Sequence, residues 1–356
     1  MSKGPIKTLE IRSSPHVVSG NSVETIMWNV VLALMPVTLF AIVAFGLTGL
    51  ITLLGAVGSC VFAEHMLTRN APGGTTIGDG SAVITGLLFG LVLPPAVPLW
   101  IIFVGGFLCM GLGKWLFGGL GANPFNPALV GRAVLQAAFP IPMTTWNESF
   151  ADNRFTSVAA SVFTLPFSRP STVDAISAAT PLSAWKFDGQ ATEVTDLLLG
   201  MTTGSAGETC AVLILLGGAW LVARNMMNWR IPLSIFVTAA VFGGIFYLVD
   251  PVHYPSPLFT LFSGGLMLGA VFMATDMVGS PMTNLGCVVY GALIALLTVS
   301  IRLWGGMPEG MMYAILLGNA AAPHIDSLVQ PRVFGTGKRG RADVSSDVST
   351  DEGGAK

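Results

Sequence analysis

The feature that most constrains this chain is a succession of apolar runs that hold almost no charged residue. A helix that spans a membrane needs about 20 such residues, because the hydrocarbon layer is about 30 Å thick. The runs are continuous and rich in Leu, Ala, Gly and Val, whereas a transmembrane barrel needs short alternating strands. We therefore predict an all-α integral membrane protein with about ten transmembrane helices, at residues 25–45, 47–66, 80–94, 96–117, 125–140, 209–224, 231–250, 258–277, 285–304 and 308–326.

The composition excludes several classes of protein. Of the 356 residues, 52% are hydrophobic and only 10% are charged, whereas a soluble domain carries about 25% charged residues. An ordinary cytosolic enzyme, a nucleic-acid-binding protein with a basic face and a disordered chain are therefore excluded. The four cysteines lie far apart in apolar runs, so we expect packing residues and neither a disulfide framework nor a metal site. They are Cys60, Cys109, Cys210 and Cys287.

The apolar runs divide the chain into five segments. A polar N-terminal segment, 1–24, precedes a first five-helix half, 25–140, and a long polar loop, 141–208. A second five-helix half, 209–330, is followed by a tail, 331–356, whose Ser, Asp and Gly content predicts disorder.

The basic residues predict the orientation of the chain. With ten spans, most of the 17 Lys and Arg residues fall on the side that carries both termini. Loops rich in Lys and Arg stay in the cytoplasm. We therefore expect a multi-pass protein of the inner (plasma) membrane, with both termini cytoplasmic and the 141–208 loop on the periplasmic or outer side.

Two pairs of short segments indicate an internal repeat. Thr85–Gly90 resembles Gly264–Gly269, and Asn126–Arg132 resembles Ile325–Arg332. Two halves of five spans each must run in opposite directions through the membrane, so the pairs predict two inverted five-helix repeats of the transporter type. Gly- and Leu-rich helices can also produce such pairs by chance.

The stretch from Asp174 to Leu182, in the predicted outer loop, combines small residues with a hydroxyl next to a proline. Pro181 favours an extended backbone at Thr180, which would present the hydroxyl, and the small neighbours leave room for a bulky group. Asp174 could orient that group. Taken alone, the stretch is either a modification site or an ordinary capped turn.

The same stretch resembles the D-x-x-S-x-A-T-P-L flavinylation motif of the D subunits of Rnf electron-transport complexes. The related B subunits of sodium-pumping NADH:quinone oxidoreductases carry a variant that usually has Gly where this chain has Ala178, so the Rnf form is favoured. The resemblance extends from about residue 14 to 335. It includes the segments 78–81, 90–95, 114–121, 126–128, 269–276, 308–310, 319–323 and 331–332.

The resemblance implies a covalent flavin. In these families the motif threonine is esterified to the phosphate of FMN by a separate flavin transferase, a role that falls on Thr180, with Asp174 and Ser177 as recognition positions. A second, non-covalent flavin, riboflavin, is also implied, as are the other members of the complex as partners. No catalytic acid–base residue is implied.

The function that the resemblance implies is electron transfer between ferredoxin and NAD, coupled to translocation of sodium ions or protons. Two alternatives stay open. In the related quinone reductases the same flavin would reduce quinone. In a secondary transporter with inverted repeats, the 141–208 loop would only cap the structure.

Polar residues inside spans are costly and therefore candidate functional residues. Arg132, at the end of a span next to the outer loop, is the candidate partner of the FMN phosphate. Asp79 and Asp276 lie where Gly-rich chain would interrupt a helix, and broken helices can hold an ion or a flavin. Pairing at helix ends is the competing explanation for these residues and for Glu64, His65 and Glu208.

Overall fold

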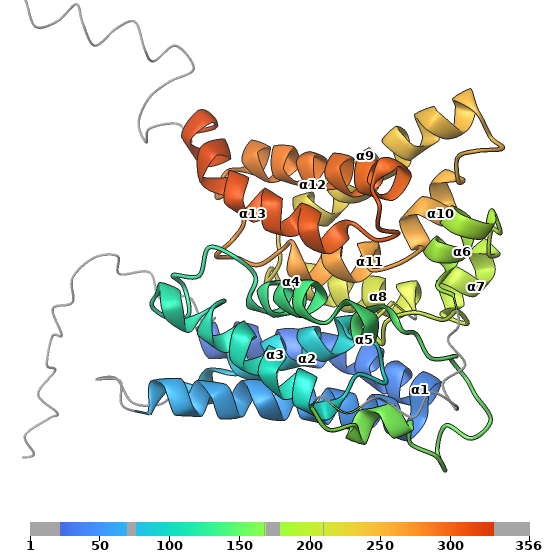
Figure 1. The fold of residues 1–356 in the computed structure, drawn as a ribbon. Coiled ribbons are helices and arrows are strands. Elements are labelled where there is room, and N and C mark those ends of the chain that lie inside the picture. The colour runs from blue at the N-terminus through green and yellow to red at the C-terminus, as the bar shows by residue number, and fades with distance from the viewer. Residues whose placement is uncertain (1–21, 70–75, 167, 169–178, 209, 331–356) are drawn as a thin grey trace, which may run out of the picture.

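The computed structural model describes residues 22–69, 76–166, 168, 179–208 and 210–330. Every regular element in these ranges is a helix, which confirms the predicted all-α class. Figure 1 shows the helices lying side by side, with the N-terminal half along one side of the molecule and the C-terminal half along the other. The predicted N-terminal segment and tail lie almost entirely outside the described residues.

The first half is built around a helix that folds back on itself (Figure 1). The bounds of its helices are α1 Val23–Thr68, α2 Ser81–Val92, α3 Leu99–Gly111 and α4 Pro127–Ala138. The first two predicted spans meet in α1 at Gly46, whose φ of 63° and ψ of −140° break the helix. The segment 141–208 satisfies the backbone there: Leu47 N–H donates to Arg154 O at 2.9 Å, and Phe150 N–H donates to Ala44 O at 2.8 Å.

The second half contains four longer helices and one broken segment. The helices are α8 Ala211–Ala223, α9 Arg230–Val249, α12 Asn284–Trp304 and α13 Met311–Leu328. The span predicted over 258–277 does not form one continuous helix. In its place lie α10 Pro257–Phe262, α11 Leu266–Leu268 and a π-helical turn over Gly269–Met273.

The break between α10 and α11 arises from the local backbone conformation, and a side chain of another helix stabilises it. Ser263 is extended and Gly264 is left-handed, with a φ of 64°. The interrupted helix leaves carbonyl groups without intrahelical donors. The guanidinium of Arg302 on α12 donates to two of them, Thr260 O at 2.7 Å and Ser263 O at 3.0 Å. A buried arginine therefore stabilises the break.

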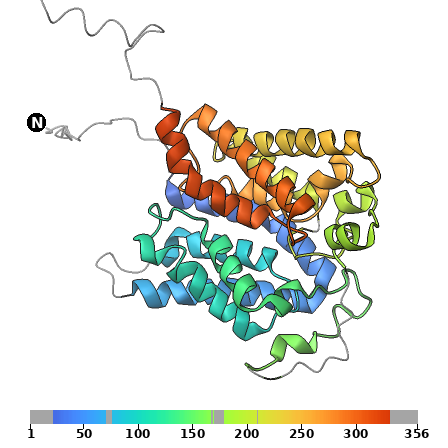
Figure 2. The same cartoon turned by 45° about the horizontal axis from the view of Figure 1, so that its top comes forward.

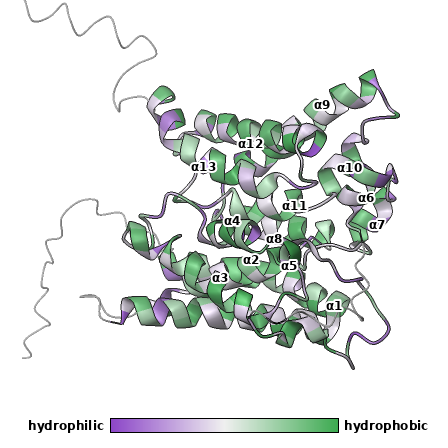
Figure 3. Cartoon of the chain, in the orientation of Figure 1, coloured by the Kyte–Doolittle hydropathy of each residue, from purple (hydrophilic) through white to green (hydrophobic). Residues whose placement is uncertain are grey.

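The helices fit a multi-pass membrane protein. Within the part of the chain that the structure describes, four segments can cross a membrane by length and apolar composition: Val23–Thr68, Leu99–Phe117, Arg230–Val249 and Asn284–Trp304. Shorter apolar helices, α2 and α8, pack among them, and Figure 3 shows hydrophobic residues along all of these helices. The number of ten spans and the inverted repeat stay predictions. Asn126 caps the start of α4, whereas Ile325 lies in the last turn of α13, so this pair of segments is not structurally equivalent.

The predicted outer loop forms several short helices at one end of the molecule. They are α5 Pro140–Thr144, a 3₁₀ turn Ala160–Phe163, α6 Pro181–Asp188 and α7 Val194–Leu199. Figures 1 and 2 place the start of α1 and the end of α13 at the opposite end from α6 and α7. The two ends of the described chain thus lie on one side, away from the segment that carries Thr180.

Candidate functional site

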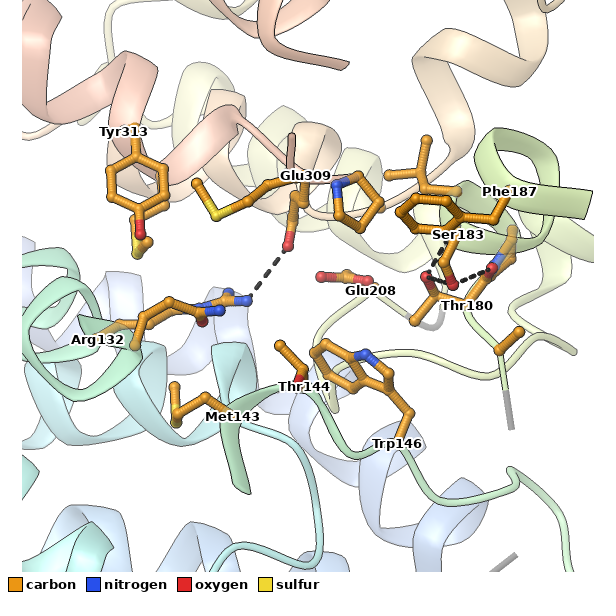
Figure 4. Close-up of a pocket in the computed structure, with 18 residues that line it drawn as sticks. Arg132, Met143, Thr144, Trp146, Thr180, Ser183, Phe187, Glu208, Glu309 and Tyr313 are labelled. Carbon is orange, nitrogen blue, oxygen red and sulfur yellow. Dashed lines mark hydrogen bonds and ion pairs between the residues drawn. The ribbon is translucent and has the colours of Figure 1, made fainter. Parts of the chain in front are cut away.

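A cavity of about 400 Å³ lies where the segment 141–208 meets both halves of the molecule (Figure 4). Its volume is within the usual range for a small-molecule site. The wall combines a guanidinium, two carboxyl groups, hydroxyl groups and aromatic rings. The residues that supply these groups include Arg132, Trp146, Thr180, Ser183, Phe187, Glu208, Glu309 and Tyr313.

Thr180 lies on the wall of this cavity as the N-cap of α6. Its backbone is extended, with a φ of −70° and a ψ of 154°, as the following Pro181 predicts. The Oγ1 atom accepts a hydrogen bond from Ser183 N–H at 3.2 Å and lies 3.0 Å from Ser183 Oγ. Because unpaired N–H groups give a helix N-terminus partial positive charge, the Thr180 hydroxyl stands where an anion would be stabilised.

Arg132 reaches the same cavity from α4 and pairs with the second half of the chain. Its Nη2 atom lies 3.2 Å from Glu309 Oε2. The other oxygen of Glu309 accepts from Gly265 N–H at 2.7 Å, just after the helix break. Although burial opposes it, the positive charges of Arg132 and Arg302 hold the pKa of Glu309 below its usual value. Glu309 is thus the anionic partner of this pair.

Polar atoms without partners face this region. Arg132 Nε and Glu208 Oε1 are buried and have no hydrogen-bond partner among the described residues. Glu208 lies in the connection between α7 and α8, outside the helices. Burial of its carboxyl and the neighbouring charge of Glu309 raise the pKa of Glu208 to about 8. Such atoms are costly unless a ligand or water satisfies them, so they mark the cavity as a polar ligand site.

The other predicted site residues fall outside the cavity or outside the described part of the chain. Asp174 and Ser177 lie outside the described residues. Asp79 accepts from Ser81 N–H at 2.8 Å and from Ser81 Oγ at 2.6 Å, at the start of α2. Asp276 accepts from Val278 N–H at 3.2 Å. Neither aspartate lines the cavity, so of the predicted ligand-binding residues that the structure describes, only Thr180 and Arg132 come together there.

Pairing at a helix end accounts for Glu64. Its carboxylate accepts from Lys114 Nζ at 2.5 Å, and both side chains are buried. Lys114 also donates to Ser81 Oγ at 2.6 Å. This cluster joins α1, α2 and the end of α3, away from the cavity that contains Thr180.

Part of the cavity wall was not predicted from the sequence. Glu309 belongs to a segment that resembles the family, but no role followed from it. Arg302 is not on the wall but supports the helix break beside it; it is a charge inside an apolar run, and that signal could have marked it as a functional candidate. Trp146 and Tyr313 carry no such signal, because aromatic residues are frequent at the ends of membrane helices.

The sequence of this chain matches the model of a known protein family. The model of the NQR2, RnfD, RnfE family matches residues 10–335. The chain belongs to this family. The matched region contains all the described helices and every residue of the cavity.

Relatives within the NQR2, RnfD, RnfE family match over nearly their whole length. The D subunit of the proton-translocating ferredoxin:NAD(+) oxidoreductase complex of Clostridium ljungdahlii is 39% identical, over 92% of this chain and 96% of the relative. The D subunit of the ion-translocating oxidoreductase complex of Sodalis glossinidius is 39% identical, over 91% and 98%. The protein of the same description from Halorhodospira halophila is 36% identical, over 97% and 99%.

Proposed function

We propose that this chain is the D subunit of an Rnf-type ion-translocating oxidoreductase complex and that it holds FMN as a phosphoester of Thr180. The complex would couple electron transfer between ferredoxin and NAD to movement of ions across the membrane, with the other members of the complex as partners. Support comes from the family match and from full-length relatives that are described as D subunits of such complexes.

The observation that carries the flavin site is the position of Thr180. Its hydroxyl caps α6 on the wall of a cavity that also holds the buried Arg132. A phosphate ester at this oxygen would lie at a helix N-terminus, beside the Ser183 amide, where negative charge is stabilised. The long flexible side chain of Arg132 brings a second positive group to the same cavity. The ester oxygen can still accept the N–H of Ser183, so modification leaves the cap intact.

The remaining wall suits the ring system of a flavin. Trp146, Phe187 and Tyr313 supply aromatic faces and edges around the cavity (Figure 4), and aromatic groups stack favourably with one another. Arg132 Nε and Glu208 Oε1 supply an unsatisfied donor and acceptor. When bound, FMN would accept and pass on electrons one or two at a time. The residues of the chain would fix its position and surround it with charge.

The two alternative functions have less support. The family includes the quinone-reductase type, but the relatives from these three organisms are described as D subunits of ion-translocating or proton-translocating oxidoreductases. A secondary transporter would need no threonine at the head of α6 and no flavin. The proposal also includes maturation by a flavin transferase, a second flavin, and the placement of Thr180 on the outer side of the inner membrane.

The test is to look for flavin on the chain itself. The complete complex is produced together with a flavin transferase, separated on a denaturing gel, and its in-gel flavin fluorescence is recorded. We expect a fluorescent band for the wild type, no band for Thr180→Val, and an unchanged band for Thr195→Val, an exposed threonine in α7. Mass spectrometry of the Thr180 peptide then shows the added FMN. A band that survives Thr180→Val contradicts the assignment.

A further inference from the structure

We infer that Glu208 is a proton-binding residue of the cavity, and that it gains and loses a proton as the flavin there is reduced and oxidised. This inference rests on the proposed function, because it needs a flavin on Thr180. It adds a specific acid to that function, one that would link electron transfer to proton movement inside this protein.

The charged groups around Glu208 come from three elements and differ in how fully their polar atoms are hydrogen-bonded. Arg132 extends from α4, Arg302 from α12, and Glu309 from the connection before α13, while Tyr313 of α13 supplies a phenol. Glu309 is satisfied by Arg132 and by Gly265 N–H. Arg302 donates to two backbone carbonyls. Glu208 has an oxygen, Oε1, that none of the described residues satisfies.

The carboxyl groups of Glu208 and Glu309 both lie close to Gly265. A Cβ added at Gly265 would overlap Glu309 Oε1 and would lie 3.4 Å from Glu208 Oε1. Two carboxylates this close repel each other, so one of them favours its protonated form. Since Arg132 holds Glu309 as the anion, the proton belongs on Glu208. Glu208 as a whole residue is partly exposed, and it lines the cavity, which gives a proton a way in.

Reduction of a flavin changes this balance. One electron from a reduced carrier of the complex adds one negative charge to the cavity, where the low dielectric makes charge interactions strong. Above about pH 8, where Glu208 is ionised, uptake of one proton from the solvent by its carboxylate would form a carboxylic acid and cancel that charge. When the electron passes on to the next carrier, Glu208 would release the proton to the solvent, so charge and atoms balance over the cycle.

The experiment is a redox titration at several pH values. The assembled complex is titrated between pH 6 and 10, and the signal of the Thr180-bound flavin is taken as the difference from Thr180→Val complex. In the wild type we expect the midpoint potential to fall more steeply above about pH 8, the region where Glu208 titrates, than in Glu208→Gln. The difference in slope should correspond to one proton. Glu193→Gln, an exposed carboxylate at the start of α7, should follow the wild type.

A second readout and a second variant complete the test. Infrared redox difference spectra of the wild type should contain a carboxylic acid band that Glu208→Gln lacks. If the Gln variant does not assemble, Glu208→Asp keeps a titratable group, and its change of slope should move to a different pH. Parallel curves for wild type and variant, with fluorescent flavin present in both, overturn the role of Glu208 alone. Absence of flavin from the wild-type chain overturns the proposed function instead.

Discussion

Arg132 in α4 and Glu309 before α13 form an ion pair across the cavity, with Nη2 and Oε2 3.2 Å apart and a separation of 177 positions in the chain. Arg132 belongs to α4 in the first half of the chain. Glu309 also accepts a hydrogen bond from Gly265 N–H in the second half. The pair therefore connects the first half of the molecule to the broken segment of the second.

Breaking this pair should destabilise the protein. In Glu309→Gln the guanidinium of Arg132 stays buried and loses its anion, which typically costs about 3 kcal/mol. Thermal unfolding of the detergent-solubilised complex measures the loss. The double variant Arg132→Met, Glu309→Gln removes both charges and should recover much of the stability. If the two single effects simply add in the double variant, the two residues are not coupled.

The kink of α1 should tolerate no side chain. A Cβ at position 46 would overlap the carbonyl oxygen of Arg154, and the φ of 63° is unfavourable for other residues. We expect Gly46→Ala to lower stability by about 2 kcal/mol or more, from strain and overpacking together. Gly58→Ala, in the same helix with no atom within 4 Å of the added Cβ, is the matched control. Equal thermal unfolding temperatures for the two variants would contradict this account.

Lys186 should hold α6 against the end of α12. Its Nζ donates to the carbonyls of Arg302 at 3.0 Å, Gly305 at 2.5 Å and Met307 at 3.0 Å. A cation is favoured at the C-terminus of a helix, and partial burial lowers the pKa of this lysine. In Lys186→Met we expect proteolysis near α6 to become several-fold faster, whereas Asp188→Asn, at an exposed position, should be cleaved like the wild type. Equal rates for Lys186→Met and wild type would show that α6 is held by other contacts.

Much of the fold follows from the apolar pattern. The junction between the first two predicted spans falls at residue 46, where the structure has its kink, because a Gly in an apolar run is the residue that can adopt a positive φ. The position of the break within the predicted span 258–277 did not follow from hydropathy, because hydropathy reports apolar character and not helix continuity. The break depends on Arg302, a residue of another helix.

The site was predictable only in part. Thr180 stands in a local motif, so the role proposed for it rests on nine consecutive residues. The pairing of Arg132 with Glu309 could not be predicted in this way, because it depends on how two distant helices pack. Glu208 was visible as a polar residue next to an apolar run, but the lack of a partner for its Oε1 atom among the described residues is a property of the assembled cavity.

The cavity draws its wall from positions 132 to 313 of the chain. During synthesis, Thr180 leaves the ribosome long before Glu309 and Tyr313 do, so a nascent chain has the attachment residue without the surrounding pocket. A ligand that needs the whole wall is therefore acquired after the last helices have been inserted. On the proposed function, loading of the flavin would then be a late maturation step, and it would report that the two halves of the molecule have come together.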